Sequence, residues 1–196
     1  GAVGFITYNG EARDSEETTD IAHRELREKL AELGKLPGVN MTIHDAMRLV
    51  QENPKMITLV VQQEAANAVS QNIIAEIQGL TRPEDVIVLT AHYDSVEYST
   101  GVYDNGAGSV ILMALLKHYH DHCPNRTLRF IWCGSEERGL LGSHAYVDTH
   151  KEDLKAIRLN LNVDVAGAIL GHDSAWCLGP QSLESMVQTY AAHNGI

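Results

Sequence analysis

The sequence predicts an α/β protein, because from residue 55 onward short apolar runs alternate with helical stretches. The run VIVLTA at 86–91 is typical of a strand, and GAGSVILMALLKHYH at 106–120 is typical of an apolar-striped helix. This alternation favours a three-layer αβα arrangement around a mostly parallel mixed sheet. Ligands of such sheets bind beyond the carboxyl ends of the strands.

The elements follow from local composition. Runs rich in Val and Ile predict short strands, and VIVLTA is continuously apolar, as strands covered on both faces are. The helix at 106–120 ends before Pro124. In chain order, strands are predicted at 56–62, 71–79, 86–91, 127–134 and 156–167, and helices at 106–120, 139–150 and 182–195.

Residues 1–52 differ in character from residues 53–196, which hold the predicted core. An apolar run at 3–8 is followed by an acidic stretch, by a charged helical segment at 21–33 and by a second amphipathic helix at 43–53. Pro37 and Pro54 follow the two helical segments. This organisation predicts a small domain or lid ahead of the core.

Composition excludes several classes of protein. The chain has 196 residues and a formal net charge of −11, which disfavours nucleic acid and anionic membrane surfaces as partners. No run approaches the roughly 20 apolar residues that a membrane-spanning helix needs. The three cysteines have no CxxC spacing, so neither a disulfide framework nor a thiolate zinc site is indicated.

Charged side chains gather where strands of the predicted sheet end. They are His92 and Asp94 after VIVLTA, Glu136 and Glu137 after FIWCG, Asp164 after LNLNV, and Asp104 in the loop before the helix at 106–120. Carboxylates crowded in a cleft repel one another unless protons or a cation neutralise them. This mixed set of one imidazole and several carboxylates suits Zn²⁺ or a related divalent ion. It contains more ligands than a single ion requires. Two ions about 3.5 to 4 Å apart would use it fully, and such pairs hydrolyse amides and phosphate esters.

Four motifs in this region resemble the M28 family of zinc metallopeptidases, of the aminopeptidase Y and bacterial leucyl aminopeptidase type. They are AHYDS at 91–95, GVYDNGAG at 101–108, GSEERGLLGS at 134–143 and NVDVAG at 162–167. The match runs in order from about Gln71 to about Gly167, roughly half of the chain. The resemblance implies a zinc-exopeptidase-like fold and a proteolytic hydrolase with two bound Zn²⁺ ions.

The resemblance also implies the metal ligands. His92 and Asp164 match the ligands of one zinc, and Asp104 in YDNGAG matches the aspartate that bridges both ions. Glu137 matches a ligand of the other zinc.

Two further carboxylates match residues that assist the reaction. Glu136 matches the general base, and Asp94 matches the carboxylate that orients the imidazole of His92. Adjacent glutamates on a strand would face opposite ways, so we expect the Glu136–Glu137 pair in a turn, which Gly134 and Gly139 permit.

The turn that follows Asp104 is expected to aim a helix at the site. Asn105 and Gly106 let the backbone reverse directly after Asp104. The helix starting near Gly106 can then point its N-terminus at the metals.

A second histidine cluster, HYHDH at 118–122, has the i, i+4 spacing of some metal sites. It lies at the far end of the predicted helix, more than two turns from Asp104, where polar side chains near the last carbonyls are expected. We therefore interpret it as a helix end rather than as part of the metal site.

The chain departs from the family pattern at both ends. The family requires one more histidine ligand, far downstream of the Asp164 position, and His193 falls in a predicted helix and is not assigned that role. The peptidase core at 53–196 is therefore expected to be C-terminally incomplete. Residues 1–52 resemble only the second half of a protease-associated domain, a domain inserted before the metal-binding part of many relatives.

The leading hypothesis is an aminopeptidase that acts on peptides with a free N-terminus. The alternatives are a glutaminyl cyclase with a single zinc, a glutamate carboxypeptidase, and a non-catalytic binding module or inactive fragment of the same fold. Family members are often secreted or placed in the cell envelope, but this sequence shows no signal. The compartment, the oligomeric state and the preferred substrate residue stay open.

Overall fold

The computed structural model describes residues 3–8, 37–62, 66–96, 99–167 and 174–195. The chain forms two compact units: one comprises residues 1–73, 93–100 and 133–155, and the other comprises residues 74–92, 101–132 and 156–196. The helix predicted at 21–33 lies outside the described residues. The boundary predicted between residues 52 and 53 stays a prediction.

A two-stranded parallel sheet lies in the first unit. It pairs β1 (Phe5–Tyr8) with β2 (Gly38–Met41), and helix α2 (Ile43–Glu52) follows directly. The helix begins after Thr42, whose Oγ1 accepts a hydrogen bond from the Asp45 amide at 3.2 Å. The helix predicted at 43–53 is thus confirmed, whereas its membership of a protease-associated domain stays a prediction.

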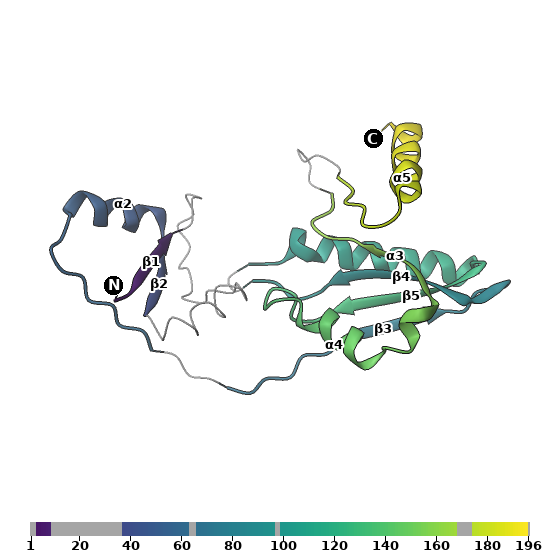
Figure 1. The fold of residues 1–196 in the computed structure, drawn as a ribbon, viewed down its shortest axis with the longest axis horizontal. Helices are drawn as coiled ribbons and strands as arrows, with labels where there is room; N and C mark the ends of the chain where they lie inside the picture. Colours follow the sequence, from purple (N-terminus) through teal and green to yellow (C-terminus); the bar gives the residue numbers. More distant parts are fainter. Residues whose placement is uncertain (1–2, 9–36, 63–65, 97–98, 168–173, 196) are drawn as a thin grey trace. The chain divides into compact units, whose positions relative to one another are not determined.

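Among the described residues, the central sheet has four strands in the order β3-β5-β4-β6, and it is mixed. The strands are β3 (Ile73–Ile77), β5 (Arg126–Cys133), β4 (Arg82–His92) and β6 (Ile157–Asn162) (Figure 1). Strands β4 and β6 run parallel, with Thr90 opposite Asn162. The predicted α/β class with a mixed sheet is confirmed.

The hydrophobic core lies between this sheet and helix α3 (Ala107–Asp121), which extends across the sheet in Figure 1. Leu112 of the helix and Phe130 of β5 have no exposed surface. Trp132 contributes a polar contact as well, because its Nε1 donates to the Ser109 carbonyl at 3.2 Å. The fully packed residues of the cluster are Leu89, Ala91, Leu112, Leu128, Phe130 and Trp132.

The remaining predicted helices are also confirmed. They are α4 (Leu141–Thr149) and α5 (Gln181–Asn194). Strand β6 ends at Asn162, five residues before the predicted end.

The strand predicted at 56–62 is wrong. No strand forms there, and Met56 and Val60 are 84% and 75% exposed. High β-propensity reflects packing against a neighbouring strand, and residues 56–62 pair with none of the described strands.

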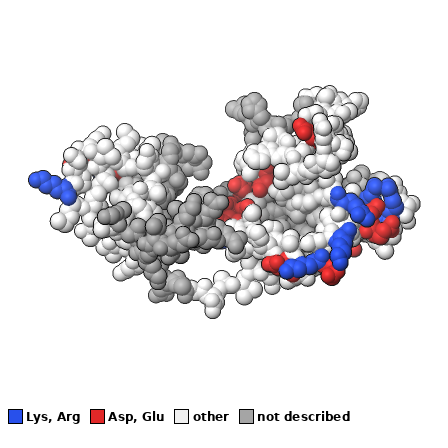
Figure 2. All heavy atoms as spheres, viewed as in Figure 1, with Lys and Arg blue, Asp and Glu red and all other residues white. Residues whose placement is uncertain are grey.

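Ion pairs join neighbouring strands of the central sheet. Arg158 Nε lies 2.6 Å from Asp85 Oδ1, and Arg129 Nε lies 2.7 Å from Glu76 Oε2. Figure 2 shows acidic and basic atoms side by side in the part of the molecule that holds the central sheet. The hydrogen bond from Arg158 lowers the pKa of Asp85, so its stabilising contribution is present above the ordinary pKa of 3.8 and is lost as the pH falls. Within the described residues, no helix has the length and apolar character needed to cross a membrane.

Leu112→Ala tests the core. The substitution should lower the free energy of unfolding by about 2 to 5 kcal/mol, because it removes buried contacts and leaves a cavity. Met113→Ala is the matched control on the same helix, since Met113 is 60% exposed, and it should change that free energy by less than about 0.5 kcal/mol. Urea unfolding followed by circular dichroism measures both. Equal effects would contradict the described packing of α3.

Candidate metal centre

The ends of β4 and β6 bring the first predicted ligands together. His92 is the last residue of β4, and Asp164 follows two residues after β6 ends at Asn162. Asp104 lies in the short turn Val102–Gly106 that precedes α3. Each of the three therefore stands where a regular element of the second unit ends or begins, as the sequence predicts.

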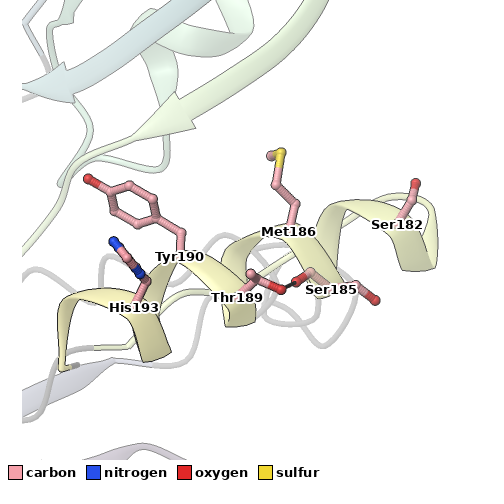
Figure 3. Close-up of a pocket in the computed structure, with 6 residues that line it drawn as sticks. All are labelled: Ser182, Ser185, Met186, Thr189, Tyr190 and His193. Carbon is pink, nitrogen blue, oxygen red and sulfur yellow. Dashed lines mark hydrogen bonds between the residues drawn. The ribbon is translucent and has the colours of Figure 1, made fainter.

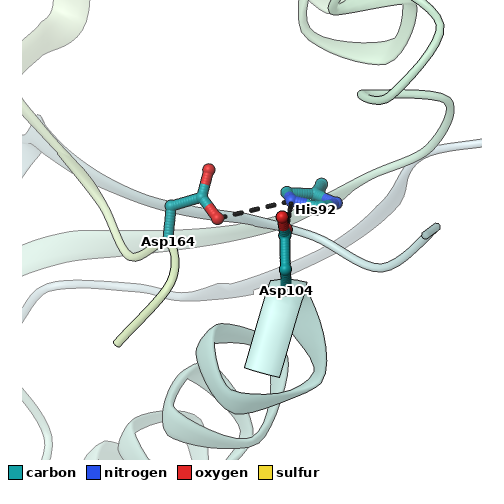
Figure 4. A group of neighbouring side chains, drawn as sticks. All are labelled: His92, Asp104 and Asp164. Carbon is teal, nitrogen blue, oxygen red and sulfur yellow. Dashed lines mark ion pairs between the residues drawn. The ribbon is translucent and has the colours of Figure 1, made fainter. Parts of the chain in front are cut away.

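The three side chains converge on one nitrogen atom. His92 Nε2 lies 2.9 Å from Asp104 Oδ1 and 3.3 Å from Asp164 Oδ1 (Figure 4). One ligand atom from each residue lies within 4.8 Å of the other two. The His92 side chain is only 3% exposed, whereas the Asp104 and Asp164 side chains are 51% and 33% exposed. The imidazole of the group is thus buried, whereas both carboxylates are accessible to a small ligand.

Hydrogen bonds at the end of β6 fix the approach of Asp164. The Val163 amide donates to the Thr90 carbonyl at 2.8 Å, and the Thr90 hydroxyl donates to Asn162 Oδ1 at 2.7 Å. Because Thr90 is two residues before His92 on β4, these bonds hold the backbone that carries Asp164 against the strand that carries the imidazole.

The backbone on the other side of His92 is held by α3 and the turn before it. The Ser109 hydroxyl donates to the His92 carbonyl at 3.0 Å. Asp104 and Asn105 have non-helical backbone angles, and the peptide bond between them is cis. The helix begins at Ala107, as predicted, and the Gly106 amide donates to the Gly101 carbonyl at 2.7 Å, so the turn encloses Asp104.

A second group of predicted residues lies in the first unit. Asp94 accepts hydrogen bonds from two successive backbone amides, those of Glu136 (2.9 Å, to Oδ1) and Glu137 (3.2 Å, to Oδ2). Ser135, just before them, has a left-handed φ of 55°. Successive amides next to such a residue form a concave site for an anion, and here the Asp94 carboxylate occupies it.

The glutamate pair lies in a turn, as the sequence predicts. The Glu136 carbonyl accepts bonds from the amides of Gly139 and Leu140, both at 2.8 Å. Gly139 has a φ of 101°, which a side chain would strain. Both glutamates are half-buried, and Glu137 Oε1 is shielded from solvent. The contact of Asp94 with the two amides was missed by sequence reasoning, because backbone donors carry no residue-type signal.

The side chain of Asn72 forms hydrogen bonds with the backbone before and after this turn. Its Oδ1 accepts from the Gly134 amide at 3.2 Å, and its Nδ2 donates to the Gly142 carbonyl at 2.8 Å. A Cβ on Gly134 would lie 2.6 Å from the Gln71 carbonyl oxygen, so glycine allows this close approach. The turn that carries Glu136 and Glu137 is therefore tied to the rest of its unit at both ends.

The first group fits a zinc ion. One imidazole nitrogen and two carboxylate oxygens are the donor types that zinc takes, and three protein ligands leave a fourth position for water or substrate. The compactness of the group supports the fit, since the three atoms already lie within 4.8 Å of one another.

Two other features of the second unit lack such a donor set. His118 and His122 stack with ring centroids 4.6 Å apart, but no third ligand joins them in the part of the chain that the structure describes. Figure 3 shows a hollow along α5, lined by Ser182, Ser185, Met186, Thr189, Tyr190 and His193. Its lining has one imidazole and no carboxylate or thiol, and His193 lies within the helix, as predicted.

The chain belongs to peptidase family M28, because residues 72–193, more than half of its length, match the model of that family. Aminopeptidase YwaD of Bacillus subtilis is 36% identical over 173 residues, which cover 85% of this chain and 35% of that protein. Leucine aminopeptidase 2 of Trichophyton equinum is 31% identical over 180 residues, covering 86% of this chain and 36% of that protein. The chain thus spans about a third of the length of these curated relatives.

Solved structures agree with this membership. BSAP, a zinc aminopeptidase from Bacillus subtilis, matches with a TM-score of 0.62 and 29% identity, over 85% of this chain and 39% of that one. The resemblance to M28 zinc metallopeptidases that the sequence motifs indicate is confirmed.

Cys133, the last residue of β5, yields a prediction about alkaline stability. Burial raises the pKa of its thiol above the ordinary value of 9.0, and the charges of Asp94 and Glu136 raise it further. The unfolded thiol therefore ionises first, so this stabilising contribution is complete below about pH 9 and is lost as the pH rises through the folded pKa.

The stability difference between wild type and Cys133→Ala should accordingly shrink between pH 8 and pH 10. Urea unfolding at both pH values measures it, with exposed Cys123→Ala as the control for general alkaline effects. A difference that is independent of pH would contradict the raised pKa.

Proposed function

We propose that the protein is a metal-dependent exopeptidase, an aminopeptidase that removes N-terminal residues from peptides with two Zn²⁺ ions. The observation that carries the proposal is the convergence of Asp104 and Asp164 on the buried Nε2 of His92. Family membership supports it, because relatives of this chain are named as aminopeptidases and one as a zinc aminopeptidase.

Four residues would hold the metals. His92 and Asp164 would be ligands of one ion, Asp104 a ligand of both, and Glu137 a ligand of the other. Bound zinc supplies a Lewis acid for the scissile carbonyl and lowers the pKa of water towards neutrality. His92 Nε2, the nitrogen proposed to bind the ion, belongs to a buried side chain and lies beside an oxygen of each aspartate.

Glu136 acts as the general base in this proposal. Its carboxylate takes a proton from the attacking water and returns it to the amine of the departing peptide. Such a group needs a fixed position, because proton transfer requires hydrogen-bond distance. The hydrogen bonds that the Glu136 and Glu137 amides donate to Asp94 fix the backbone of Glu136 and thereby support this role. The orientation of His92 by Asp94, expected from the family, is part of the same proposal.

The charge of the site favours a cationic end on the substrate. The five proposed carboxylates carry a charge of −5, which two bound Zn²⁺ ions would offset by +4, and the chain carries a formal net charge of −11. A free α-ammonium group would be attracted, whereas the terminal carboxylate of a peptide would be repelled. This favours an aminopeptidase over a glutamate carboxypeptidase.

The alternative functions make different predictions for metal content and substrates. A glutaminyl cyclase would bind one zinc per chain and convert N-terminal glutamine without consuming water. A non-catalytic module would bind metal or peptide without turnover. Metal analysis of the full-length gene product, with amino-acid anilides and C-terminal glutamyl peptides as substrates, separates these cases.

Glu136→Gln tests the proposed base. In the full-length gene product, kcat for an amino-acid anilide should fall by about 10²- to 10⁴-fold while zinc content stays the same. Glu152→Gln is the matched control, since the Glu152 side chain is 87% exposed, and it should leave kcat unchanged. Activity within about threefold of wild type in Glu136→Gln, with both metals bound, would exclude this glutamate as the base.

His92→Ala tests the first zinc site. Loss of the buried nitrogen ligand should remove one zinc per chain or weaken its binding by at least about 100-fold, and a chelator should abolish the activity of wild type reversibly. His120→Ala removes an exposed imidazole and should retain full metal content. Competition with a chromogenic chelator measures both variants. Unchanged zinc affinity in His92→Ala would contradict the ligand assignment.

A further inference from the structure

We propose that Asn105 is a positioning residue of the metal centre, whose carboxamide sets the spacing between the carboxylates of Asp104 and Asp164. The inference rests on the proposed metal-dependent function and adds to it a residue that binds neither metal nor substrate. It concerns a side chain that is 1% exposed and among the most deeply buried of the described residues.

The carboxamide of Asn105 joins two segments that are distant in sequence. Its Nδ2 donates to the Val163 carbonyl at 2.9 Å, just beyond the end of β6. Its Oδ1 accepts from the Gly108 amide at 3.0 Å, in the first turn of α3. One side chain thus ties the beginning of the helix to the segment that carries Asp164.

Each of these contacts lies next to a proposed ligand. Asn105 is bonded directly to Asp104, and Val163 is bonded directly to Asp164. Both backbone polar groups of Val163 are engaged, its amide with Thr90 and its carbonyl with Asn105. The bond from Asn105 therefore restrains both aspartates at once, relative to the strand that ends in His92.

Only a side chain with a donor and an acceptor at this distance satisfies both partners. Aspartate would place an acceptor against the Val163 carbonyl oxygen, leaving that half-buried oxygen without its donor. Leucine, of similar size, would satisfy neither the carbonyl nor the Gly108 amide. Asparagine is therefore required here for its chemistry and not only for its volume.

Close packing leaves this contact little room to adjust. A Cβ added to Gly108 would lie 2.3 Å from the Val163 carbonyl oxygen and 2.4 Å from Asn105 Oδ1. Gly108, the second glycine of the motif YDNGAG, thus permits the helix to approach Val163 closely enough for Asn105 to bridge the two segments. Because the surrounding atoms are closely packed, a displacement of the carboxamide would also displace Asp104 and Asp164.

Metal affinity should therefore depend on Asn105. Side chains that orient metal ligands typically cost about 10- to 100-fold in affinity when replaced. We expect the Asn105→Asp variant of the full-length gene product to lose affinity by this factor. The loss applies to the more tightly bound of its metal ions, measured with Zn²⁺ or with Co²⁺. The visible absorption bands of bound Co²⁺ should shift as well, because the ligand geometry changes. Competition with a chromogenic chelator and Co²⁺ absorption spectroscopy are the measurements.

Asn194→Asp is the matched control. Asn194 donates from Nδ2 to the Tyr190 carbonyl at 2.8 Å, so the same substitution removes the same kind of bond at an exposed helix end. It should leave affinity and Co²⁺ spectrum at wild-type values. Asn105→Ser is the second variant, since a hydroxyl keeps a donor and an acceptor on a smaller side chain, and it should lose affinity by a smaller factor.

Three outcomes are decisive. Weaker metal binding with a shifted Co²⁺ spectrum in a folded Asn105 variant supports the inference. A lower melting temperature of the metal-free protein with unchanged affinity and spectrum in Asn105→Asp, or in Asn105→Ser if the aspartate variant does not fold, overturns it and shows a purely structural residue. Wild-type protein that binds neither Zn²⁺ nor Co²⁺ refutes the proposed function together with the inference.

Discussion

The approach of two carboxylates to one buried imidazole nitrogen is the constraint on which the account of this protein depends. Asp104 and Asp164 come from segments that are distant in sequence, and both place an oxygen within 3.3 Å of His92 Nε2. Bringing two negative groups together costs free energy unless a positive charge compensates them. A divalent cation can compensate both negative charges.

The fold supplies this arrangement through hydrogen bonds to backbone carbonyls, donated by the Val163 amide and by the short side chains of Ser109 and Asn105. Strand β6 is held against β4 up to Val163, α3 is held against the end of β4 by Ser109, and Asn105 closes the remaining gap. Beneath them, Leu112 and Phe130 pack without exposed surface. Strand β4 delivers His92, and the chain then continues directly to Asp94, which holds the turn of Glu136 and Glu137.

Sequence reasoning located the proposed site residues at the ends of elements because strand periodicity and parallel-sheet topology place functional groups there. It also predicted the turn at Glu136 from the two flanking glycines. It missed the contacts of Asn105 and Asp94, since their partners are backbone groups that no residue type announces. The strand predicted at 56–62 was wrong, because Val and Ile favour strands only where a partner strand is available. The short strand β2 was not predicted, since GVNM has a single β-branched residue.

Anomalous X-ray scattering at the zinc absorption edge, from crystals of the full-length gene product grown with Zn²⁺, tests the central claim most directly. The account predicts an anomalous peak about 2.0 to 2.2 Å from His92 Nε2 and from carboxylate oxygens of Asp104 and Asp164. Zinc-loaded crystals that show no peak at this position, with the imidazole still in direct contact with both carboxylates, would contradict it.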